Sequence, residues 1–298
     1  MLVRDVRPWM PILLAGALCA AAPGAAEEED PPKLLGRCTT AQLEAEPFSE
    51  WYVAGHDAYV GDPQVLRSLR NAGLDGVEVT IFFGAWCGDS RREVPRMVKL
   101  LEQAGLPTAR VHLIAVDRGG DAHKRSPDGE ERGREIYRVP TLVVERAGRE
   151  LSRIVEFPVL SLERDLLAIL SDVGYQPNYA SYPAIREWLA AGLLADPNVS
   201  ARGLAGRLRL RVASEGELEA AATVLESRGQ RVEALKLLET NCVLHGESAG
   251  CHARLAEALL DAGRAEVARA AAERAIRLND DPSRTQDLLD LLARAVPR

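Results

Sequence analysis

The sequence has few aromatic side chains and no excess of positive charge. Phe, Trp and Tyr together make up 5% of the 298 residues, so the composition gives no sign of a large aromatic-lined ligand pocket. The formal net charge is −7, whereas a nucleic-acid-binding protein needs a basic face. The charges are also spread along the chain. We therefore expect no nucleic acid among its partners.

A long apolar run is missing as well. The run over residues 9–22 is shorter than the roughly 20 apolar residues that a helix needs to cross a bilayer. It follows two arginines and precedes the small residues 23–26, which is the order of a secretory signal peptide. We expect residues 1–26 to be removed after Ala26, with Ala22 as the second choice. The mature chain is then exported, with the bacterial periplasm as its expected compartment and no membrane span.

Cysteine is scarce, with five in the chain. Cys19 falls inside the expected signal, and a lipid anchor on it is disfavoured because Leu18 stands where that signal needs Gly or Ala. Export places the mature chain in a compartment that permits disulfides. An even number of cysteines remains there, so pairing has to be considered for each of Cys38, Cys87, Cys242 and Cys251.

Hydrophobic patterning divides the mature chain into an α/β part and an all-α part. We expect an irregular lead-in over residues 27–60, an α/β domain over 61–172, a linker over 173–184 and a helical domain over 185–298. The predicted elements of the α/β domain are a helix from Pro63 to near Gly73, a strand over 77–83, a helix over 91–104, a strand over 111–116, a surface loop or frayed helix over 117–134, a β-hairpin with strands at 141–144 and 151–155, and a helix over 162–170.

The segment Phe82-Phe83-Gly84-Ala85-Trp86-Cys87-Gly88-Asp89-Ser90 places Cys87 where a helix should begin. A helix N-terminus presents unpaired N–H groups and the positive end of the dipole, which stabilise a thiolate. This segment, together with Val139-Pro140-Thr141, resembles the thioredoxin superfamily over roughly residues 62–172. The resemblance implies a thioredoxin fold with Cys87 as nucleophile, Trp86 beside the sulfur and a cis Pro140 against it. It also implies that an extended client peptide binds along residues 139–141.

The motif departs from that family at two positions. Ser90 stands where the resemblance implies a second, resolving cysteine, and Ile81 stands where many members carry a buried acid. Disulfide exchange passes through a mixed disulfide that a second thiol must release, so an outside thiol has to complete the reaction of Cys87. Two interpretations stay open. The chain is either a monothiol oxidoreductase or client-binding redox protein acting on protein thiols or disulfides without a cofactor, or a non-catalytic module for protein interaction or assembly.

Cys38 is a candidate resolving thiol outside the motif. If the lead-in folds back over the motif, Cys38 can pair with Cys87, provided that the two Cα atoms lie within about 7 Å. The alternative is a free or externally linked cysteine in a mobile segment.

An internal repeat runs through the helical domain, with a period of 34 residues. Over residues 215–282 it resembles two tetratricopeptide repeats, a type that stacks into a concave surface for a peptide or partner protein. The alternative is a small capping or dimerising module. The matched positions are Leu225, Gly229, Ala234 and Leu238 in one copy and Leu259, Gly263, Ala268 and Ala272 in the next. Each Gly is expected in a turn that needs a left-handed residue.

Cys242 and Cys251 lie on either side of the tight connection between two predicted helices. Residues placed in this way face one another, so we expect a structural disulfide. Zinc is the rival ligand because His245 and His252 sit beside the cysteines. Cys251 and His252 are adjacent in sequence, however, and point to different faces of a helix, so shared coordination is awkward. We therefore expect no metal.

Overall fold

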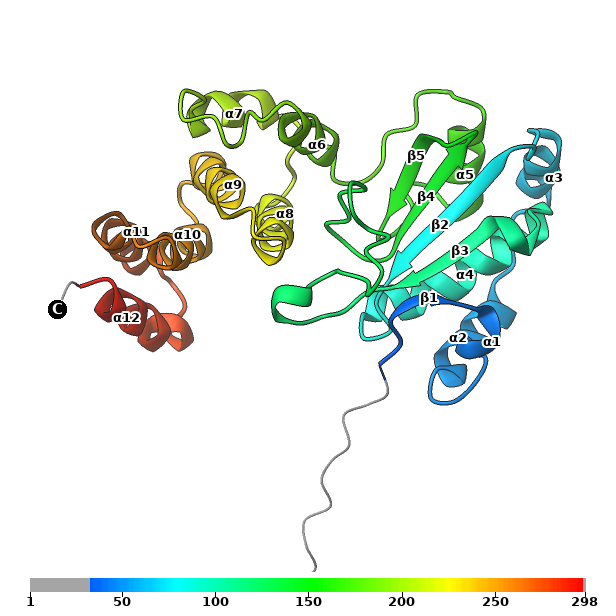
Figure 1. Cartoon of the computed structure of the whole chain (residues 1–298), viewed down its shortest axis with the longest axis horizontal. Helices are drawn as coiled ribbons and strands as arrows, with labels where there is room; N and C mark the ends of the chain where they lie inside the picture. The colour runs from blue at the N-terminus through cyan, green and yellow to red at the C-terminus, as the bar shows by residue number, and fades with distance from the viewer. Residues whose placement is uncertain (1–32, 297–298) are drawn as a thin grey trace, which may run out of the picture. The chain divides into compact units, whose positions relative to one another are not determined.

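A computed structural model describes the chain over residues 33–296 (Figure 1). The expected signal over residues 1–26 lies outside these residues. No helix of the described part is long and apolar enough to cross a membrane. The elements are β1 Gly36–Cys38, α1 Thr40–Leu43, α2 Ser49–Ala58, α3 Pro63–Asn71, β2 Val77–Phe83, α4 Gly88–Ala104, β3 Val111–Ala115, β4 Thr141–Arg146, β5 Arg149–Val155, α5 Leu162–Leu170, α6 Tyr182–Ala190, α7 Ala201–Leu208, α8 Glu215–Ser227, α9 Arg231–Leu244, α10 Ala249–Asp261, α11 Ala265–Leu278 and α12 Thr285–Arg294, with single 3-10 turns at Thr108–Arg110, Gly120–Ala122 and Pro282–Arg284.

The five strands form one mixed sheet in the order β1-β3-β2-β4-β5. The central strand β2 runs parallel to β3 and antiparallel to β4, and its register places Phe83 opposite Ala115. Every residue of β2 except Glu78 is buried, which explains the continuous apolar and β-branched run in the sequence. The predicted hairpin is present as β4 and β5, and both of its turn residues, Ala147 and Gly148, have positive φ.

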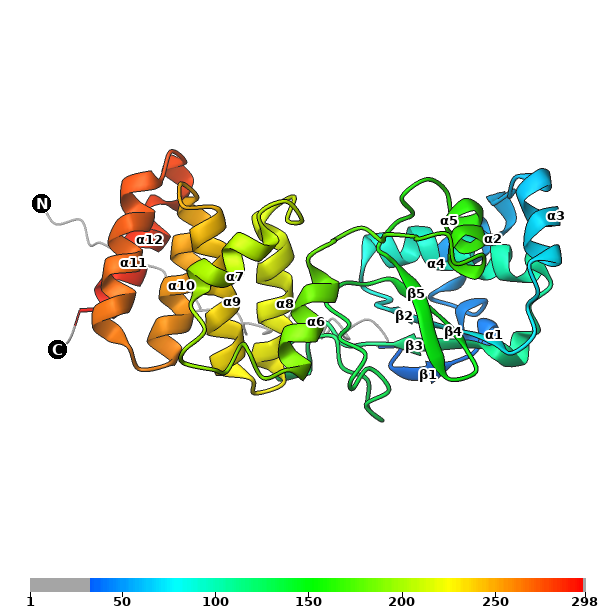
Figure 2. The same cartoon turned by 90° about the horizontal axis from the view of Figure 1, so that it is seen from above.

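Different parts of the chain cover the two faces of the sheet. Helices α1 to α5 pack on one face, in a core that contains Ile81 and Phe83 of β2. The opposite face, which contains Phe82, is covered by the chain between β3 and β4, including Ile136 and Val139. The segment over 117–134 also reaches this face, because the Arg134 guanidinium lies 5.9 Å from the centroid of the Phe82 ring, and several of its polar residues are buried. Figure 2 shows this loop as irregular chain on the side of the sheet away from α2 and α4.

The lead-in is more ordered than the sequence pattern predicts. From residue 36 it contributes a strand and two helices, and β1 pairs antiparallel with β3 so that Cys38 lies opposite Leu113. Leu43 and Tyr52 are buried in the same core as the first sheet face. Thr39 forms a capping box with Gln42, a local signal of a helix start that the pattern of apolar residues does not capture. The linker is also shorter than predicted, because α6 begins at Tyr182.

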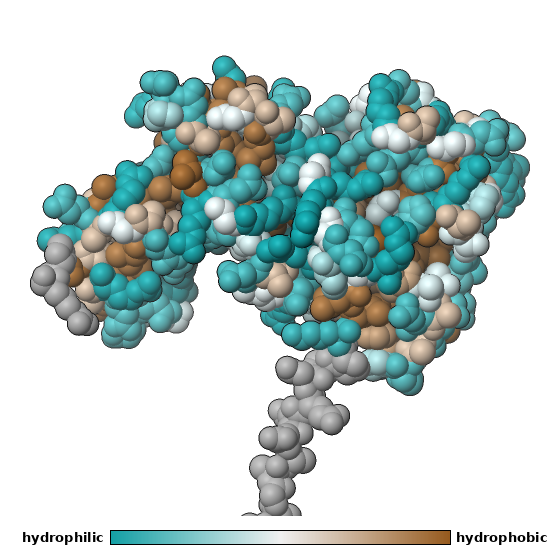
Figure 3. Space-filling model, viewed as in Figure 1, coloured by the Kyte–Doolittle hydropathy of each residue, from teal (hydrophilic) through white to brown (hydrophobic). Residues whose placement is uncertain are grey.

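The C-terminal region consists of helices α6 to α12. Within it α8 packs on α9 and α10 packs on α11, as Figures 1 and 2 both show. Gly229 and Gly263 end the first helix of each pair with φ of +78° and +71°, which confirms the left-handed turns expected from the repeat. The matched Ala and Leu positions are buried between the helices. On the face shown in Figure 3, hydrophilic residues cover most of the surface and hydrophobic ones form smaller patches.

Candidate functional site

Cys87 is the N-cap residue of α4, immediately after the central strand. Its backbone N–H donates to the Gly84 carbonyl at 2.9 Å, and its own carbonyl accepts the first helical hydrogen bond, from Arg91 at 3.0 Å. The side chain is half-buried and makes no capping hydrogen bond. The sulfur therefore lies at the positive end of a 17-residue helix and remains partly open to solvent.

The loop before β4 lies against this sulfur. The Val139–Pro140 peptide bond is cis, and the Cys87 Sγ donates to the Val139 carbonyl at 3.4 Å. The Thr141 hydroxyl donates to the Arg138 carbonyl at 2.8 Å, which fixes the loop as it enters the strand. The structure thus brings Cys87 together with residues 139–141, as the sequence predicts.

Trp86 lies next to the cysteine and is anchored to the neighbouring strand. Its indole N–H donates to the Val116 carbonyl at 2.9 Å, and the Arg118 guanidinium lies 6.0 Å from the ring centroid. Gly84 makes this packing possible, because a Cβ at that position would lie 2.5 Å from Cε2 of the indole. The ring covers the end of β2 and is itself only half-buried.

Ser90, which stands where the resemblance implies a resolving cysteine, is a fully buried side chain. Its hydroxyl oxygen accepts a hydrogen bond from the Gly84 N–H at 3.2 Å, so the serine closes the turn between β2 and α4. Asp89 lies outside and is paired with Arg92 at 2.8 Å. Gly88 is the first residue of α4, three residues earlier than the pattern of apolar residues predicts.

Cys38 does not lie near Cys87. Its side chain belongs to the core on the face of the sheet that carries Ile81, whereas Cys87 packs with the cluster on the opposite face. The Cys38 thiol donates to the Leu113 carbonyl at 3.6 Å, and burial raises its pKa to about 12. A thiol in this environment remains protonated at neutral pH and is a poor nucleophile.

Lys124 is a residue of the site that the sequence analysis did not identify. It lies in the loop that covers the second sheet face and is only 9% exposed. Burial and, after it, the positive charge of Arg138 lower its pKa to about 8, against the opposite effect of Glu156 and of an ionised Cys87. A lone lysine in a polar loop gives no sequence signal of this placement.

Arg138, next to the cis peptide, joins this loop to the helical region. Its guanidinium donates to the Tyr182 hydroxyl at 2.9 Å and to the Gly216 carbonyl of α8 at 2.8 Å. It also pairs with Glu156 at 3.1 Å and lies 4.5 Å from the Tyr179 ring centroid. The Val139–Pro140 loop is therefore supported from both parts of the chain.

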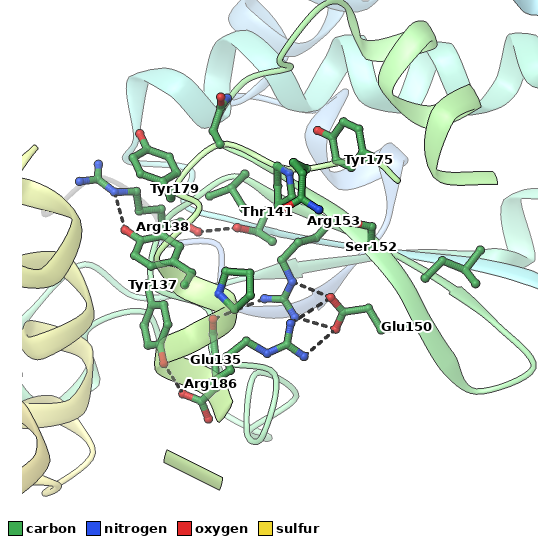
Figure 4. Close-up of a pocket in the computed structure, with 17 residues that line it drawn as sticks. Glu135, Tyr137, Arg138, Thr141, Glu150, Ser152, Arg153, Tyr175, Tyr179 and Arg186 are labelled. Carbon is green, nitrogen blue, oxygen red and sulfur yellow. Dashed lines mark hydrogen bonds and ion pairs between the residues drawn. The ribbon is translucent and has the colours of Figure 1, made fainter. Parts of the chain in front are cut away.

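A pocket of about 330 Å³ lies beside Arg138, between β5 and the chain that leads into α6 (Figure 4). Tyrosines line one side of it. On the other side Arg153 and Arg186 both reach Glu150, at 2.7 and 3.1 Å. Two guanidiniums share one carboxylate here, so this group of three side chains carries a net positive charge.

In the helical region Cys242 and Cys251 are both free thiols, so the disulfide expected between them is not formed in this structure. The Cys251 Sγ donates to a Glu215 carboxylate oxygen at 3.3 Å. The proximity of Cys242, together with burial, raises the pKa of Cys251. Within residues 33–296, no group of three or more His, Cys, Asp or Glu side chains is placed to hold a metal ion.

The sequence match to a known protein covers part of the chain. Over 88 residues, which is 30% of the chain, it is 36% identical to mitochondrial thioredoxin-2 of Schizosaccharomyces pombe. The chain spans 59% of the length of that protein. No protein-family model matches the chain, and no solved structure matches it. This match and the mixed sheet with its helices fit a thioredoxin-like domain followed by a helical region.

Proposed function

We propose that this chain is an exported monothiol thiol–disulfide oxidoreductase, or client-binding redox protein, with Cys87 as its nucleophile. The observation that carries the proposal is the position of the Cys87 sulfur, at the N-terminus of α4 and 3.4 Å from the carbonyl before a cis proline. Helix end, partial exposure and a shaped loop together provide what an attacking thiolate needs.

Cys87 is the one thiol of the motif, so the proposed reaction needs a second thiol from outside it. The Cys87 thiolate attacks a sulfur of a client disulfide, so that a Cys87–client disulfide forms, the client S–S bond breaks and the other client sulfur leaves as a thiolate. Ser90 has no sulfur with which to release the client. A second thiolate, from a small thiol or another protein, attacks the client sulfur of the mixed disulfide. Cys87 then leaves as a thiolate, and the client holds the new disulfide.

A polypeptide client is supported by the surface around the cis proline. The N–H of Glu156 donates to the Pro140 carbonyl at 2.7 Å, so the chain after β5 lies beside this loop. Its next residues include the exposed side chains of Phe157, Val159 and Leu160, the last of them 77% exposed. Apolar groups exposed beside a reactive sulfur favour an unfolded or extended protein segment over a small polar substrate.

The helical region is proposed to recruit a partner protein through tetratricopeptide-like repeats. The 34-residue period, the paired helices and the left-handed glycines between them support this repeat type. We also propose that residues 1–26 direct export to the bacterial periplasm. In that compartment Cys242 and Cys251, which are neighbouring free thiols in the structure, close a structural disulfide.

Trapping of mixed disulfides tests the redox proposal. The full-length protein is expressed in a bacterium that exports it, thiols are blocked with acid and alkylating agent, and adducts are resolved without reductant. We expect adducts with client proteins that disappear with reductant and in the Cys87→Ser variant, whereas the Cys38→Ser variant keeps them. A protein without adducts that depend on Cys87 would be the non-catalytic interaction module instead.

A further inference from the structure

The pocket of Figure 4 has two arginines on one carboxylate. Arg153 of β5 has a side chain that is only 9% exposed, and its guanidinium donates to the Glu150 carboxylate at 2.7 Å and to the Arg134 carbonyl at 2.8 Å. Arg186 of α6 reaches the same carboxylate at 3.1 and 3.2 Å. Burial acts to raise the pKa of Glu150, but the hydrogen bonds and charges of these two arginines together lower it, so the carboxylate stays ionised. One positive charge is therefore left over.

The other charged groups of the pocket lining are paired one to one. Arg138 pairs with Glu156 at 3.1 Å, and Glu135 pairs with Arg228 at 2.7 Å. The excess charge therefore belongs to the two arginines that share a carboxylate. Of these, Arg186 is the more open, with a side chain that is 34% exposed, so it is the one that can meet a ligand.

One face of α6 offers unused donors to this pocket. Tyr182 and Arg186 stand one helical turn apart, so they lie on the same face of the helix, and both line the pocket. In the described part of the chain, the Nε of Arg186 makes no hydrogen bond, and the Tyr182 hydroxyl accepts from Arg138 at 2.9 Å but donates to no group. The Tyr179 ring stacks on that of Tyr182, with centroids 5.2 Å apart, so the wall beside these donors is aromatic. Free N–H and O–H donors with an excess positive charge favour a carboxylate over a neutral ligand.

The register of the sheet places this pocket on the same side as Cys87. Phe82 lies opposite Thr141, and Thr141 lies opposite Val155, so these three side chains share one face. Arg153 precedes Val155 by two positions in β5 and therefore points to that face as well. Cys87 packs with the cluster that contains Phe82. Because β5 is two strands away from β2, the pocket and the thiol are about 10 Å apart across the sheet.

We propose that this pocket receives the carboxylate side chain of an Asp or Glu in the client segment, about three residues from the cysteine that Cys87 attacks. The inference rests on the proposed redox function and names one feature of its substrate. An extended segment advances about 3.3 Å per residue, so about three residues span the distance from the sulfur to the pocket. Arg186 then donates to the carboxylate through the N–H groups that Glu150 does not use, and Tyr182 donates its hydroxyl proton. The client carboxylate neutralises the charge that Glu150 leaves uncompensated.

Binding of short peptides tests the pocket without any redox chemistry. One fluorescently labelled peptide, acetylated and amidated, has serine in place of the client cysteine and a glutamate about three positions away, and its twin has glutamine instead of that glutamate. With the full-length protein, fluorescence anisotropy should show the glutamate peptide binding on the order of tenfold tighter. Arg186→Gln should abolish this preference, whereas Glu150→Gln should widen it, because the carboxylate that competes for Arg186 is gone. Arg149→Gln is the matched control and should keep the preference, because Arg149 is an exposed arginine of β5 outside the pocket lining.

Three results would overturn the inference. The first is a wild type without the preference, and the second is a preference that survives Arg186→Gln. The third is displacement of the labelled peptide by N-acetylglutamate amide as effectively as by unlabelled peptide, since the pocket would then take a free small carboxylate. A preference that depends on Arg186, in a protein that forms no adducts through Cys87, would support the acidic-segment pocket while the proposed redox function fails.

The placement beside Cys87 has its own readout. The cysteine forms of the two peptides are supplied as disulfides with nitrothiobenzoate, so that attack by Cys87 forms the Cys87–peptide disulfide and releases nitrothiobenzoate, which is followed by its absorbance. The glutamate peptide should react faster than its glutamine twin when the glutamate is about three positions from the cysteine, and no faster when it is about eight positions away. Equal rates for the two peptides at the shorter spacing would overturn the placement of the pocket along the client segment.

Discussion

Replacing Lys124 by Met should make the protein more stable at neutral pH. The pKa of this lysine falls from 10.5 to about 8 on folding, mainly because of burial. A drop of this size corresponds to about 3 kcal/mol of folding free energy lost at neutral pH. Methionine has a similar length and no charge, and it gives up only the hydrogen bond to His123, a loss of about 1 kcal/mol. We expect a net gain of about 2 kcal/mol in the free energy of unfolding.

The gain should vanish in alkali, and the sign follows from the two pKa values. Below about pH 8 Lys124 is charged in both the folded and the unfolded chain, so the cost of burial is present in full. Between about pH 8 and 10.5 the folded chain loses this proton while the unfolded chain keeps it, so the stability of the wild type rises with pH relative to the variant. By about pH 10 the two free energies of unfolding should be nearly equal.

Urea unfolding followed by circular dichroism measures this difference at the two pH values. Lys99→Met on α4 is the control. It removes a lysine that is only half-buried, so its effect should stay within about 0.5 kcal/mol. A Lys124→Met variant that is no more stable at neutral pH, or whose advantage is unchanged in alkali, would show that the ammonium is not held in a desolvated site.

Three further substitutions or measurements test other parts of the structure. Ser90→Cys should create a dithiol with Cys87, so that an intramolecular disulfide appears by mass mapping and trapped client adducts of Cys87 fall several-fold. Undiminished adducts would contradict this. Gly84→Ala should destabilise the protein by about 1–3 kcal/mol, because the new Cβ would lie 2.5 Å from the Trp86 ring. An unchanged midpoint of urea unfolding would refute the tight packing. Protein isolated from an oxidising compartment should contain a Cys242–Cys251 disulfide. Reducing it should lower the free energy of unfolding by about 2–3 kcal/mol. Free thiols at these positions would exclude the disulfide.

The sequence predicts the parts of this fold that depend on short-range patterns. The strand β2 follows from a continuous apolar and β-branched run and the turn Ala147–Gly148 from turn chemistry, and the structure has both. The helix that follows Cys87 is also predicted from its helical period, although its start at Gly88 lies three residues before the predicted one. Each of these signals is contained within about ten neighbouring residues, so no tertiary contact is needed to recognise it.

Long-range packing determines what the sequence pattern misses. β1 has three residues and is ordered by pairing with β3, about 75 residues further along the chain. The same pairing places Cys38 in the core and away from Cys87. The spacing of the cysteines in the sequence does not indicate this position. Lys124 is buried because the loop around it covers a sheet face, and neither its own identity nor its neighbours in sequence indicate that face.

The contacts of Arg138 bear on whether the helical region is separable from the thiol site. Two of its hydrogen bonds go to the Tyr182 hydroxyl and to the carbonyl of Gly216, and both acceptors belong to the helical region. Its own carbonyl receives the hydrogen bond from Thr141, and the next residue supplies the carbonyl that contacts the Cys87 sulfur. The same guanidinium adds its charge to the surroundings of Lys124. The helical region thus helps to hold the loop that lies against the Cys87 sulfur. On the proposed function, a partner that moved α6 or α8 would therefore also act on the loop beside the reactive cysteine.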